Sequence, residues 1–344
     1  MGVCSAAQNL IFLMEEVELC FPQLNTSCWK TKRPLSHTVL IYMVLSFISL
    51  LTVTLNLLVV ISISHFKQLQ SPTNLLLLSL AFSDFFVGLI VLFQIMLING
   101  CWFLGDLVCT LYFVLEYVIS CTSVGIMVLI SIDRYVAICD PLHYSTKVTP
   151  GRVLVCVLLC WIGSLFYVCI VMKDEFKNPG RYNSCAGECV MISRISDQIT
   201  DFTVIFLIPV TVIIVLYMRV FVVAVSQARA MRSHIAAVSL ERSVKVTVKK
   251  SEIKAAGTLG VVIVVFIICT CPYFCVTVTG QEALFNASSA AFVMCLFYCN
   301  SCLNPLIYAF FYPWFRKSIR LTVTLQILKP GSCDTNLLYQ NLSK

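Results

Sequence analysis

Long apolar runs, separated by short polar connectors, dominate the pattern of this chain. Seven of them are long enough to cross the hydrocarbon core of a bilayer, which is about 30 Å thick, as α-helices. Their approximate bounds are 38–64, 73–98, 107–132, 152–172, 199–223, 255–279 and 288–312. The pattern therefore predicts an all-α membrane protein whose fold is a bundle of seven transmembrane helices.

The segment after the last run has a different pattern. In "FRKSIRLTVTLQIL", which follows Pro313, basic side chains fall on one side of a helix and apolar ones recur at helical spacing. This pattern is typical of a short amphipathic helix at a membrane surface. The chain then divides into an extracellular N-terminal segment (1–37), a seven-helix domain (38–312), and a cytoplasmic amphipathic helix with a tail (313–344).

Composition supports residence in a lipid bilayer. Of the 344 residues, 59% are hydrophobic and 12% are charged, and the mean hydropathy is +0.91, which excludes a soluble globular domain. Basic residues set the orientation, because cytoplasmic connectors carry an excess of Lys and Arg. With the N-terminus outside, 17 of the 24 basic residues fall on the cytoplasmic side. We therefore expect a multi-pass protein of the plasma membrane with an extracellular N-terminus.

The outer connectors contain the informative cysteines and one informative sequon. Most of the 19 cysteines lie within apolar runs, where a thiol behaves as a small hydrophobic group. Others lie outside, where an oxidising compartment permits disulfides, but their number does not determine the pairing. The informative ones are Cys20, Cys28, Cys109, Cys185 and Cys189. The sequon that begins at Asn25 also lies outside, so we expect Asn25 to be glycosylated.

Other functional classes lack support in the sequence. There are no matching halves with broken helices, which a transporter would have, and no rings of pore-lining charge, which a channel would have. The four histidines form no cluster with a nucleophile or with metal ligands, and there is no phosphate-binding loop. We therefore expect the chain not to be an enzyme and to have no nucleic-acid partner.

Motifs that occur in the right order within the spans resemble those of a known family. Asp133-Arg134-Tyr135 ends the third span, and Asn304-Pro305-Leu306-Ile307-Tyr308 ends the seventh. The other markers are Asn56, Asp84, Trp161, Pro209 and Pro272. Together they resemble rhodopsin-like (class A) G-protein-coupled receptors. The stretch "NSCLNPLIYAFFYPWF", from Asn300 to Phe315, further resembles the seventh-helix fingerprint of the trace amine-associated receptors, as do "NTSCWK" and "SCAGEC".

This resemblance implies a receptor for small amines with a chemosensory or olfactory role. It also implies activation of a heterotrimeric G protein, of the stimulatory type that acts through cyclic AMP. The implied disulfides are Cys109–Cys189 and a bond from Cys185 to an N-terminal cysteine, for which Cys20 is preferred to Cys28. The alternative is a class A receptor for a non-amine ligand, such as a peptide or a lipid. A multi-pass transporter is the least favoured alternative.

Two carboxylates within the spans are candidate ligand anchors. Glu116 lies in the apolar stretch "LYFVLEYVIS", where an acidic side chain costs roughly 2.5–3.5 kcal/mol to insert. From the rise of an α-helix, Glu116 lies about 10 Å below Cys109, and Asp201 lies about 12 Å above Pro209. By the resemblance, Glu116 replaces the usual aspartate that pairs with a ligand ammonium. We therefore expect one amine or a diamine between Glu116 and Asp201.

Each anchor also has a purely structural interpretation. Asp201 can be an exposed residue at the entry of its helix, and Glu116 can be a protonated acid that is hydrogen-bonded to a nearby tyrosine. Ring faces attract ammonium ions, and four aromatic residues fall at the same depth as the two acids. These candidate ligand contacts are Tyr117, Tyr273, Phe274 and Tyr298. Aromatic residues are common in membrane helices, so their presence alone does not identify a ligand site.

The resemblance also assigns residues to activation. In the inactive state Arg134 would pair with Asp133 or with Glu252, and outward movement of the sixth helix would break the second pair. The other implied coupling residues are Tyr135, Tyr217, Phe266, Pro272, Asn304, Pro305 and Tyr308. Thr270 departs from the family pattern, because class A receptors usually carry a tryptophan there at the pocket floor.

A further polar group matches the buried ion site of class A receptors. It consists of Asp84, Ser123, Asn300 and Asn304. Oxygen ligands that include one carboxylate suit a hard cation such as sodium. The alternative is a hydrogen-bond network of water without an ion. We therefore expect no cofactor other than an allosteric sodium ion.

Overall fold

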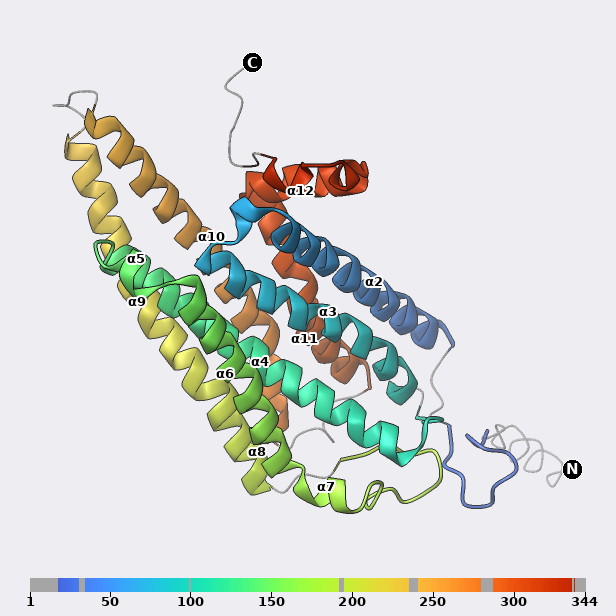
Figure 1. The fold of residues 1–344 in the computed structure, drawn as a ribbon. Helices are drawn as coiled ribbons and strands as arrows, with labels where there is room; N and C mark the ends of the chain where they lie inside the picture. Colours follow the sequence, from blue (N-terminus) through green and yellow to red (C-terminus); the bar gives the residue numbers. More distant parts are fainter. Residues whose placement is uncertain are drawn as a thin grey trace, which may run out of the picture.

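The computed structural model describes residues 18–30, 35–98, 100–191, 195–234, 241–279, 287–335 and 337. Within these residues the chain forms a bundle of long helices that run side by side (Figure 1). Seven of the described helical stretches are long and apolar enough to cross a membrane. The predicted fold, a bundle of seven membrane-length helices, is therefore confirmed.

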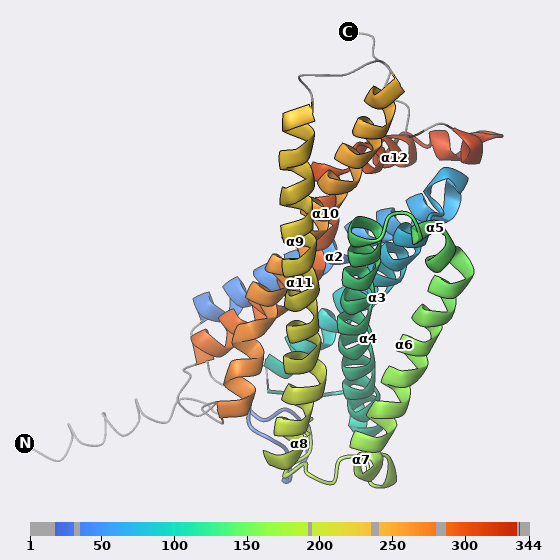
Figure 2. The same ribbon diagram turned by 90° about the vertical axis from the view of Figure 1, so that its left-hand side faces the viewer.

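The long helices follow one another along the chain, with short helices between them. The long ones are α2 (Leu35–His65), α3 (Pro72–Ile98), α4 (Gly105–Cys139), α6 (Pro150–Val171), α9 (Ile208–His234), α10 (Glu241–Thr279) and α11 (Ala287–Phe311). The short ones are η1 (Lys67–Leu69), α5 (Tyr144–Lys147), α7 (Lys173–Lys177), α8 (Ile195–Asp201), η2 (Phe202–Leu207), α12 (Pro313–Val323), η5 (Gln326–Leu328) and η6 (Ser332–Asp334). Figure 2 shows that α9 and α10 extend beyond the other helices at the end where α12 lies.

The helices do not end where hydropathy falls. α4 continues to Cys139 rather than ending near residue 132, and α10 begins at Glu241 rather than near residue 255. Asp133 and Arg134, which suggested the end of the third span, are buried and paired with each other inside α4. Hydropathy therefore marks the lipid-facing part of a helix rather than its whole length.

A π-helical segment, η2, interrupts the fifth span between α8 and α9. The N–H of Ile208 donates to the carbonyl of Thr203, five residues earlier, and Pro209, which has no N–H, follows directly. A π turn contains one extra residue, which rotates the residues before it by about 100° relative to a continuous α-helix. The segment therefore controls the direction of Asp201, the last residue of α8, which is buried.

Polar side chains and a glycine fix the contact of α2 with its neighbours. The Asn56 side-chain amide donates to the carbonyl of Ser301 in α11 at 2.9 Å. The Ser49 hydroxyl donates to the carbonyl of Gly88 in α3 at 2.7 Å. A Cβ at Gly88 would lie 3.0 Å from the backbone nitrogen of Val53, so only glycine permits this approach of the two helices.

Helix α12 crosses the end of the bundle opposite the N-terminal segment (Figure 1). Its Trp314 and Phe315 are buried while Arg316 and Lys317 are exposed, which is the expected amphipathic arrangement. The tail that follows α12 returns to η1, where the Lys67 ammonium lies 3.0 Å from Asp334 and holds the pKa of that carboxyl below its ordinary value.

Three disulfides tie together the end of the bundle at which residues 18–30 lie. They join Cys20 to Cys101, Cys28 to Cys185, and Cys109 to Cys189. We call the segments that they connect, residues 18–30, 100–109 and 182–189, the outer plate. Backbone hydrogen bonds reinforce it, because the Trp102 N–H donates to the carbonyl of Gly187 at 2.7 Å.

The predicted bond between Cys20 and Cys185 is wrong, whereas Cys109 does pair with Cys189. A bridge between Ser27 and Ala186 places Cys28 beside Cys185. Cys20 instead forms a disulfide with Cys101, in the connector after α3, a cysteine for which no pairing was predicted. The error arose because a backbone pairing between distant segments, and not spacing along the chain, selects the partners.

We predict that Cys20→Ser and Cys101→Ser lower the stability of the detergent-solubilised protein equally, by roughly 2–5 kcal/mol. The double variant should lose no more than either single one, because both remove the same bond. Thermal unfolding monitored by fluorescence measures the effect, with Cys169→Ser, an exposed free cysteine, as the control. Non-reducing peptide mapping that finds Cys20 linked to Cys185 would contradict the observed pairing.

Candidate functional site

A cavity of about 420 Å³ opens among α4, the connector before α8, α8, η2, α10 and α11. We call it the inner cavity. Five of the six side chains that we predicted to contact a ligand line it. They are Glu116, Tyr117, Asp201, Tyr273 and Phe274. None of the described residues that line this cavity is basic, so its two carboxylates give it a negative character.

Asp201 is held at the wall of the inner cavity by two tyrosines. It is nine-tenths buried. The Tyr117 hydroxyl donates to Oδ2 at 3.2 Å, and the Tyr167 hydroxyl donates to Oδ1. Tyr117 belongs to α4 and Tyr167 to α6, so the carboxylate joins three spans. The interpretation of Asp201 as an exposed helix-entry residue is therefore wrong.

Glu116 lines the inner cavity and also accepts a hydrogen bond from a residue that does not line it. The hydroxyl of Tyr298 in α11 donates to its Oε1 at 3.0 Å. Tyr298 is fully buried and does not line the cavity, so it does not lie at the ligand-facing position that we predicted. It orients the carboxylate instead. One turn earlier in α4, the Tyr112 hydroxyl donates to Oε1 of Gln94 in α3 at 2.6 Å.

Stacked aromatic rings form the wall of the inner cavity beside α10. Phe274 stacks on Phe206 with ring centroids 4.6 Å apart, and Tyr273 lies 4.7 Å from Phe297. The exposed ring faces of such residues favour a cation over a neutral polar group. The wall can therefore supplement the two carboxylates in holding an ammonium ion.

Sequence reasoning missed eight of the lining residues. They are Phe113, Ser120, Cys121, Met191, Gln198, Phe202, Thr277 and Phe297. Phe113 and Ser120 are spaced at one helical turn from Glu116 and Tyr117, so helix periodicity could have identified them. Met191 lies outside the helices and Gln198 lies in the short helix α8, and no periodic pattern in the sequence predicts that either residue faces this cavity.

Asp84 is the centre of a second polar group, deeper in the bundle. It accepts hydrogen bonds from Ser301 and Asn304, each at 2.8 Å. Ser123 donates instead to Ser83 in α3 at 2.9 Å. The Asn300 and Asn304 side-chain oxygens are buried and have no hydrogen-bond partner among the described residues. Ser301 was not predicted, because a serine beside a buried aspartate has no distinguishing signal.

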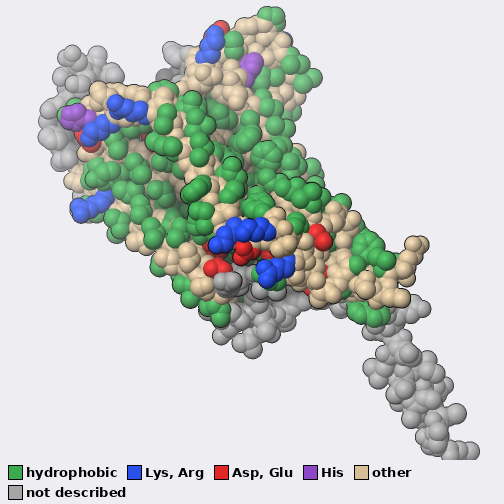
Figure 3. All heavy atoms as spheres, turned by 60° about the horizontal axis from the view of Figure 1, so that its bottom comes forward, with side chains coloured by type: hydrophobic (Ala, Val, Ile, Leu, Met, Phe, Trp, Pro, Cys, Tyr) green, Lys and Arg blue, Asp and Glu red, His purple; other side chains and the backbone are tan. Residues whose placement is uncertain are grey.

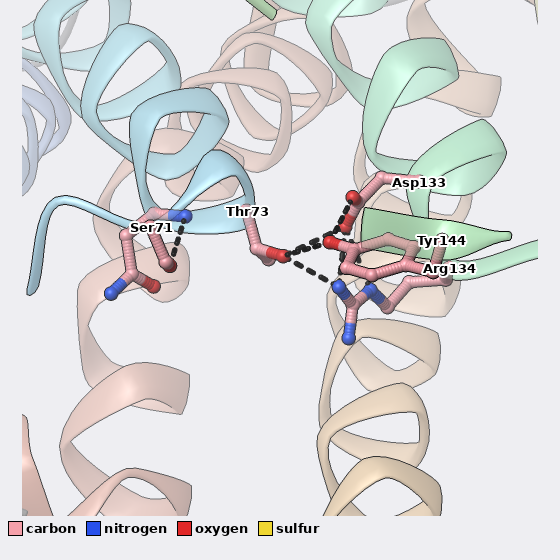
Figure 4. A network of polar contacts seen from close by, with 6 residues as sticks. Ser71, Thr73, Asp133, Arg134 and Tyr144 are labelled. Carbon is pink, nitrogen blue, oxygen red and sulfur yellow. Dashed lines mark hydrogen bonds and ion pairs between the residues drawn. The ribbon is translucent and has the colours of Figure 1, made fainter. Parts of the chain in front are cut away.

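Arg134 is fixed near the C-terminal end of α4 by a closed polar network (Figure 4). Its Nε and Nη2 donate to Oδ2 of Asp133 at 2.9 and 2.5 Å. Nη2 also donates to the Thr73 hydroxyl at 2.5 Å, and this hydroxyl donates to Asp133 at 2.9 Å. The Tyr144 hydroxyl donates to the other oxygen of Asp133 at 2.8 Å. Thr73 and Tyr144 were not predicted, yet they complete the network.

The other predicted coupling residues lie on several helices and differ in burial. Tyr217 and Tyr308 are directed inward, and their buried hydroxyls have no hydrogen-bond partner among the described residues. Tyr135 is exposed, and Phe266 is buried in the main hydrophobic core. Pro272 lies within α10 and Pro305 within α11. Glu252 belongs to α10, but its side chain lies outside those described.

Thr270, the departure from the family pattern, is buried, and its hydroxyl donates to the carbonyl of Phe266 in its own helix at 2.7 Å. It therefore contributes no polar group to the inner cavity.

At the outer plate, Asn25 is exposed on a turn, a position that a glycosylating enzyme can reach.

Comparison with known proteins gives extensive similarity. Residues 55–308 match the family model described as 7 transmembrane receptor (rhodopsin family). Trace amine-associated receptor 8a of Rattus norvegicus is 39% identical over 338 residues, which cover 95% of this chain and 98% of the relative. Trace amine-associated receptor 6 of Homo sapiens is 38% identical over 341 residues, 96% and 98% of the two chains. Trace amine-associated receptor 13c of Danio rerio is 36% identical over 329 residues, 93% and 96%.

We predict that Thr73→Val lowers the stability of the protein by roughly 1.5–3 kcal/mol, because a buried guanidinium and a carboxylate each lose a partner. The midpoint of thermal unfolding in detergent measures the loss. Thr211→Val is the matched control, since the exposed Thr211 bonds the carbonyl of Leu207 in its own helix. Equal midpoints for the two variants would show that Thr73 does not support the network.

Proposed function

Because this chain belongs to the rhodopsin family of seven-transmembrane receptors and, within it, to the trace amine-associated receptors, we propose that it detects a protonated amine or diamine and activates a heterotrimeric G protein. The chain is a multi-pass membrane protein and not an enzyme. Its proposed place is the plasma membrane, with the N-terminus outside and Asn25 glycosylated.

The observation that carries the amine proposal is the composition of the inner cavity. Glu116 and Asp201 both line it, and none of its described lining residues is basic. Two carboxylates in a cavity whose described lining has no basic side chain favour a cationic guest, because a cation offsets both their desolvation and their mutual repulsion. The names of the relatives, which are trace amine-associated receptors, support the same ligand class.

The two carboxylates have different roles in this proposal. Asp201 is the principal anchor, since Tyr117 and Tyr167 fix its orientation before a ligand arrives. Glu116 has a side chain that is longer by one methylene and accepts a hydrogen bond from Tyr298, so its carboxylate can follow the second nitrogen of a diamine. A monoamine would then depend mainly on Asp201, whereas a diamine would use both acids.

The cytoplasmic network supports the proposed coupling. Arg134 is paired with Asp133 and Thr73, so a partner helix that needs its guanidinium must first open this group. Tyr217 and Tyr308 have hydroxyls without described partners and can receive the released guanidinium. Stimulatory coupling through cyclic AMP and a chemosensory role complete the proposal.

We predict that Asp201→Asn raises the amine concentration needed for a half-maximal response at least about 100-fold, because the ammonium group of the bound ligand loses the carboxylate that pairs with it. Glu116→Gln should weaken diamines more than monoamines. Glu116→Asp should move the preferred diamine to a chain longer by about one methylene, since the carboxylate retreats by roughly 1.3 Å. A cyclic AMP reporter in cells, with an amine and diamine panel, measures all three.

The control for these variants is Glu18→Gln, which removes an exposed carboxylate of the outer plate that pairs with Lys30 at 3.1 Å. It should leave the responses unchanged. Absence of any amine response at normal surface expression would contradict the proposal. A response to a neutral ligand that survives Asp201→Asn would instead identify a class A receptor for a non-amine ligand.

We further propose that the polar group around Asp84 holds an allosteric sodium ion. The residues fit such an ion, because the buried carboxylate of Asp84 accepts a hydrogen bond from Asn304, whose amide oxygen is buried without a described hydrogen-bond partner. The amide oxygen of Asn300, one turn earlier in α11, is likewise buried without a described partner. The Ser123 hydroxyl donates a hydrogen bond to the Ser83 hydroxyl, which leaves the lone pairs of the Ser123 oxygen for a cation. A hard cation prefers such oxygen ligands.

We predict that sodium chloride raises the thermal stability of the wild-type protein more than potassium chloride at equal concentration does. A tenfold excess of sodium over its dissociation constant stabilises the folded state by about 1.4 kcal/mol. Asp84→Asn should abolish the difference between the two salts. Equal shifts in both salts for the wild type would exclude a selective sodium site and favour a network of water.

A further inference from the structure

A second cavity, of about 540 Å³, lies on the other side of Asp201. The outer end of α6, helix α7, the connector that contains Tyr182, and Thr200 of α8 line it. We call it the outer cavity. Figure 3 shows Lys, Arg, Asp and Glu side chains gathered on the surface at the end of the molecule where α7 and α8 lie.

Asp201 forms a wall that both cavities share. Its Oδ2 accepts from Tyr117, which lines both cavities, and its Oδ1 accepts from Tyr167, which lines only the outer one. A carboxylate offers about four lone-pair sites, so each oxygen can accept another donor while both tyrosine bonds remain. A donor can therefore reach Asp201 from either side.

The charges of the outer cavity favour a cation. Four carboxylates line it, from Asp174, Glu175, Asp197 and Asp201, against two ammonium groups, from Lys173 and Lys177. Neither lysine forms an ion pair with another residue of the described part of the chain, and both are exposed. Their long side chains can extend into water, whereas Asp201 is fixed and buried.

We propose that the outer cavity is a second binding site for organic ammonium ions, back to back with the inner cavity through Asp201. The choice of an amine as occupant rests on the proposed function, whereas the shape and charge of the cavity do not. Since one carboxylate serves both sites, a cation in either one weakens the other. The coupling is equal in both directions.

Cysteine modification tests the outer cavity without relying on signalling. Thr200→Cys introduces a thiol in its lining, and Ser196→Cys introduces one a single turn earlier on the same helix, exposed but outside both cavities. Intact cells are treated with a trimethylammonium methanethiosulfonate or with a neutral one of similar size. The parent protein gives the background from its own cysteines.

For each variant, the measured quantity is the modification rate with the cationic reagent divided by the rate with the neutral one. This ratio should be at least about fivefold higher for Thr200→Cys than for Ser196→Cys, because a cleft of one charge sign concentrates counter-ions. Asp174→Asn should reduce that preference, and Glu18→Gln should leave it unchanged. A high concentration of 1,4-diaminobutane should protect position 200 and leave position 196 reactive. Raised ionic strength should weaken the preference.

Equal reagent ratios at the two positions, or equal protection by the diamine, would overturn the second site. That result together with a normal amine response in the cyclic AMP assay would leave the proposed function intact. Selective modification at position 200 without any amine response would instead remove the proposed function and leave the outer cation site. Surface labelling of each variant confirms that it reaches the membrane.

Discussion

The rest of this structure depends on one constraint: acidic side chains inside a bundle of membrane helices need hydrogen-bond partners. An acidic side chain in a membrane helix is costly unless other groups satisfy it. Each of the four acids Asp84, Glu116, Asp133 and Asp201 accepts at least one hydrogen bond from another described helix. The acids therefore specify which helices must be neighbours, and they also supply the groups that a ligand, an ion or a movement of helices can use.

The sequence predicted the part of this arrangement that depends on residue type and depth. Glu116 and Asp201 were recognisable because acids are rare in apolar spans, and their depth follows from helical rise. Their partners were harder to predict, since Tyr167, Thr73 and Ser301 are common residue types in membrane helices. Tyr298 was placed at the correct depth but on the wrong side of Glu116, because a helix presents several directions at one level.

Two further differences arise from interactions between distant segments. The direction of Asp201 depends on the π turn before Pro209, and a proline alone does not predict that turn. The disulfide of Cys20 depends on how the N-terminal segment pairs with the connector that contains Ala186. In both cases the local sequence pattern predicted the correct segment. Contacts between distant segments then determined the direction of Asp201 and the disulfide partner of Cys20.

The outer plate has a consequence for the binding of a guest. Three covalent bonds join the N-terminal segment and two connectors to one another and to the start of α4. Much of the entropy needed to order this region is therefore lost when the protein folds and oxidises, and not when a guest arrives. A guest that contacts the outer plate therefore orders few residues as it binds, and little of its binding free energy is lost to that ordering.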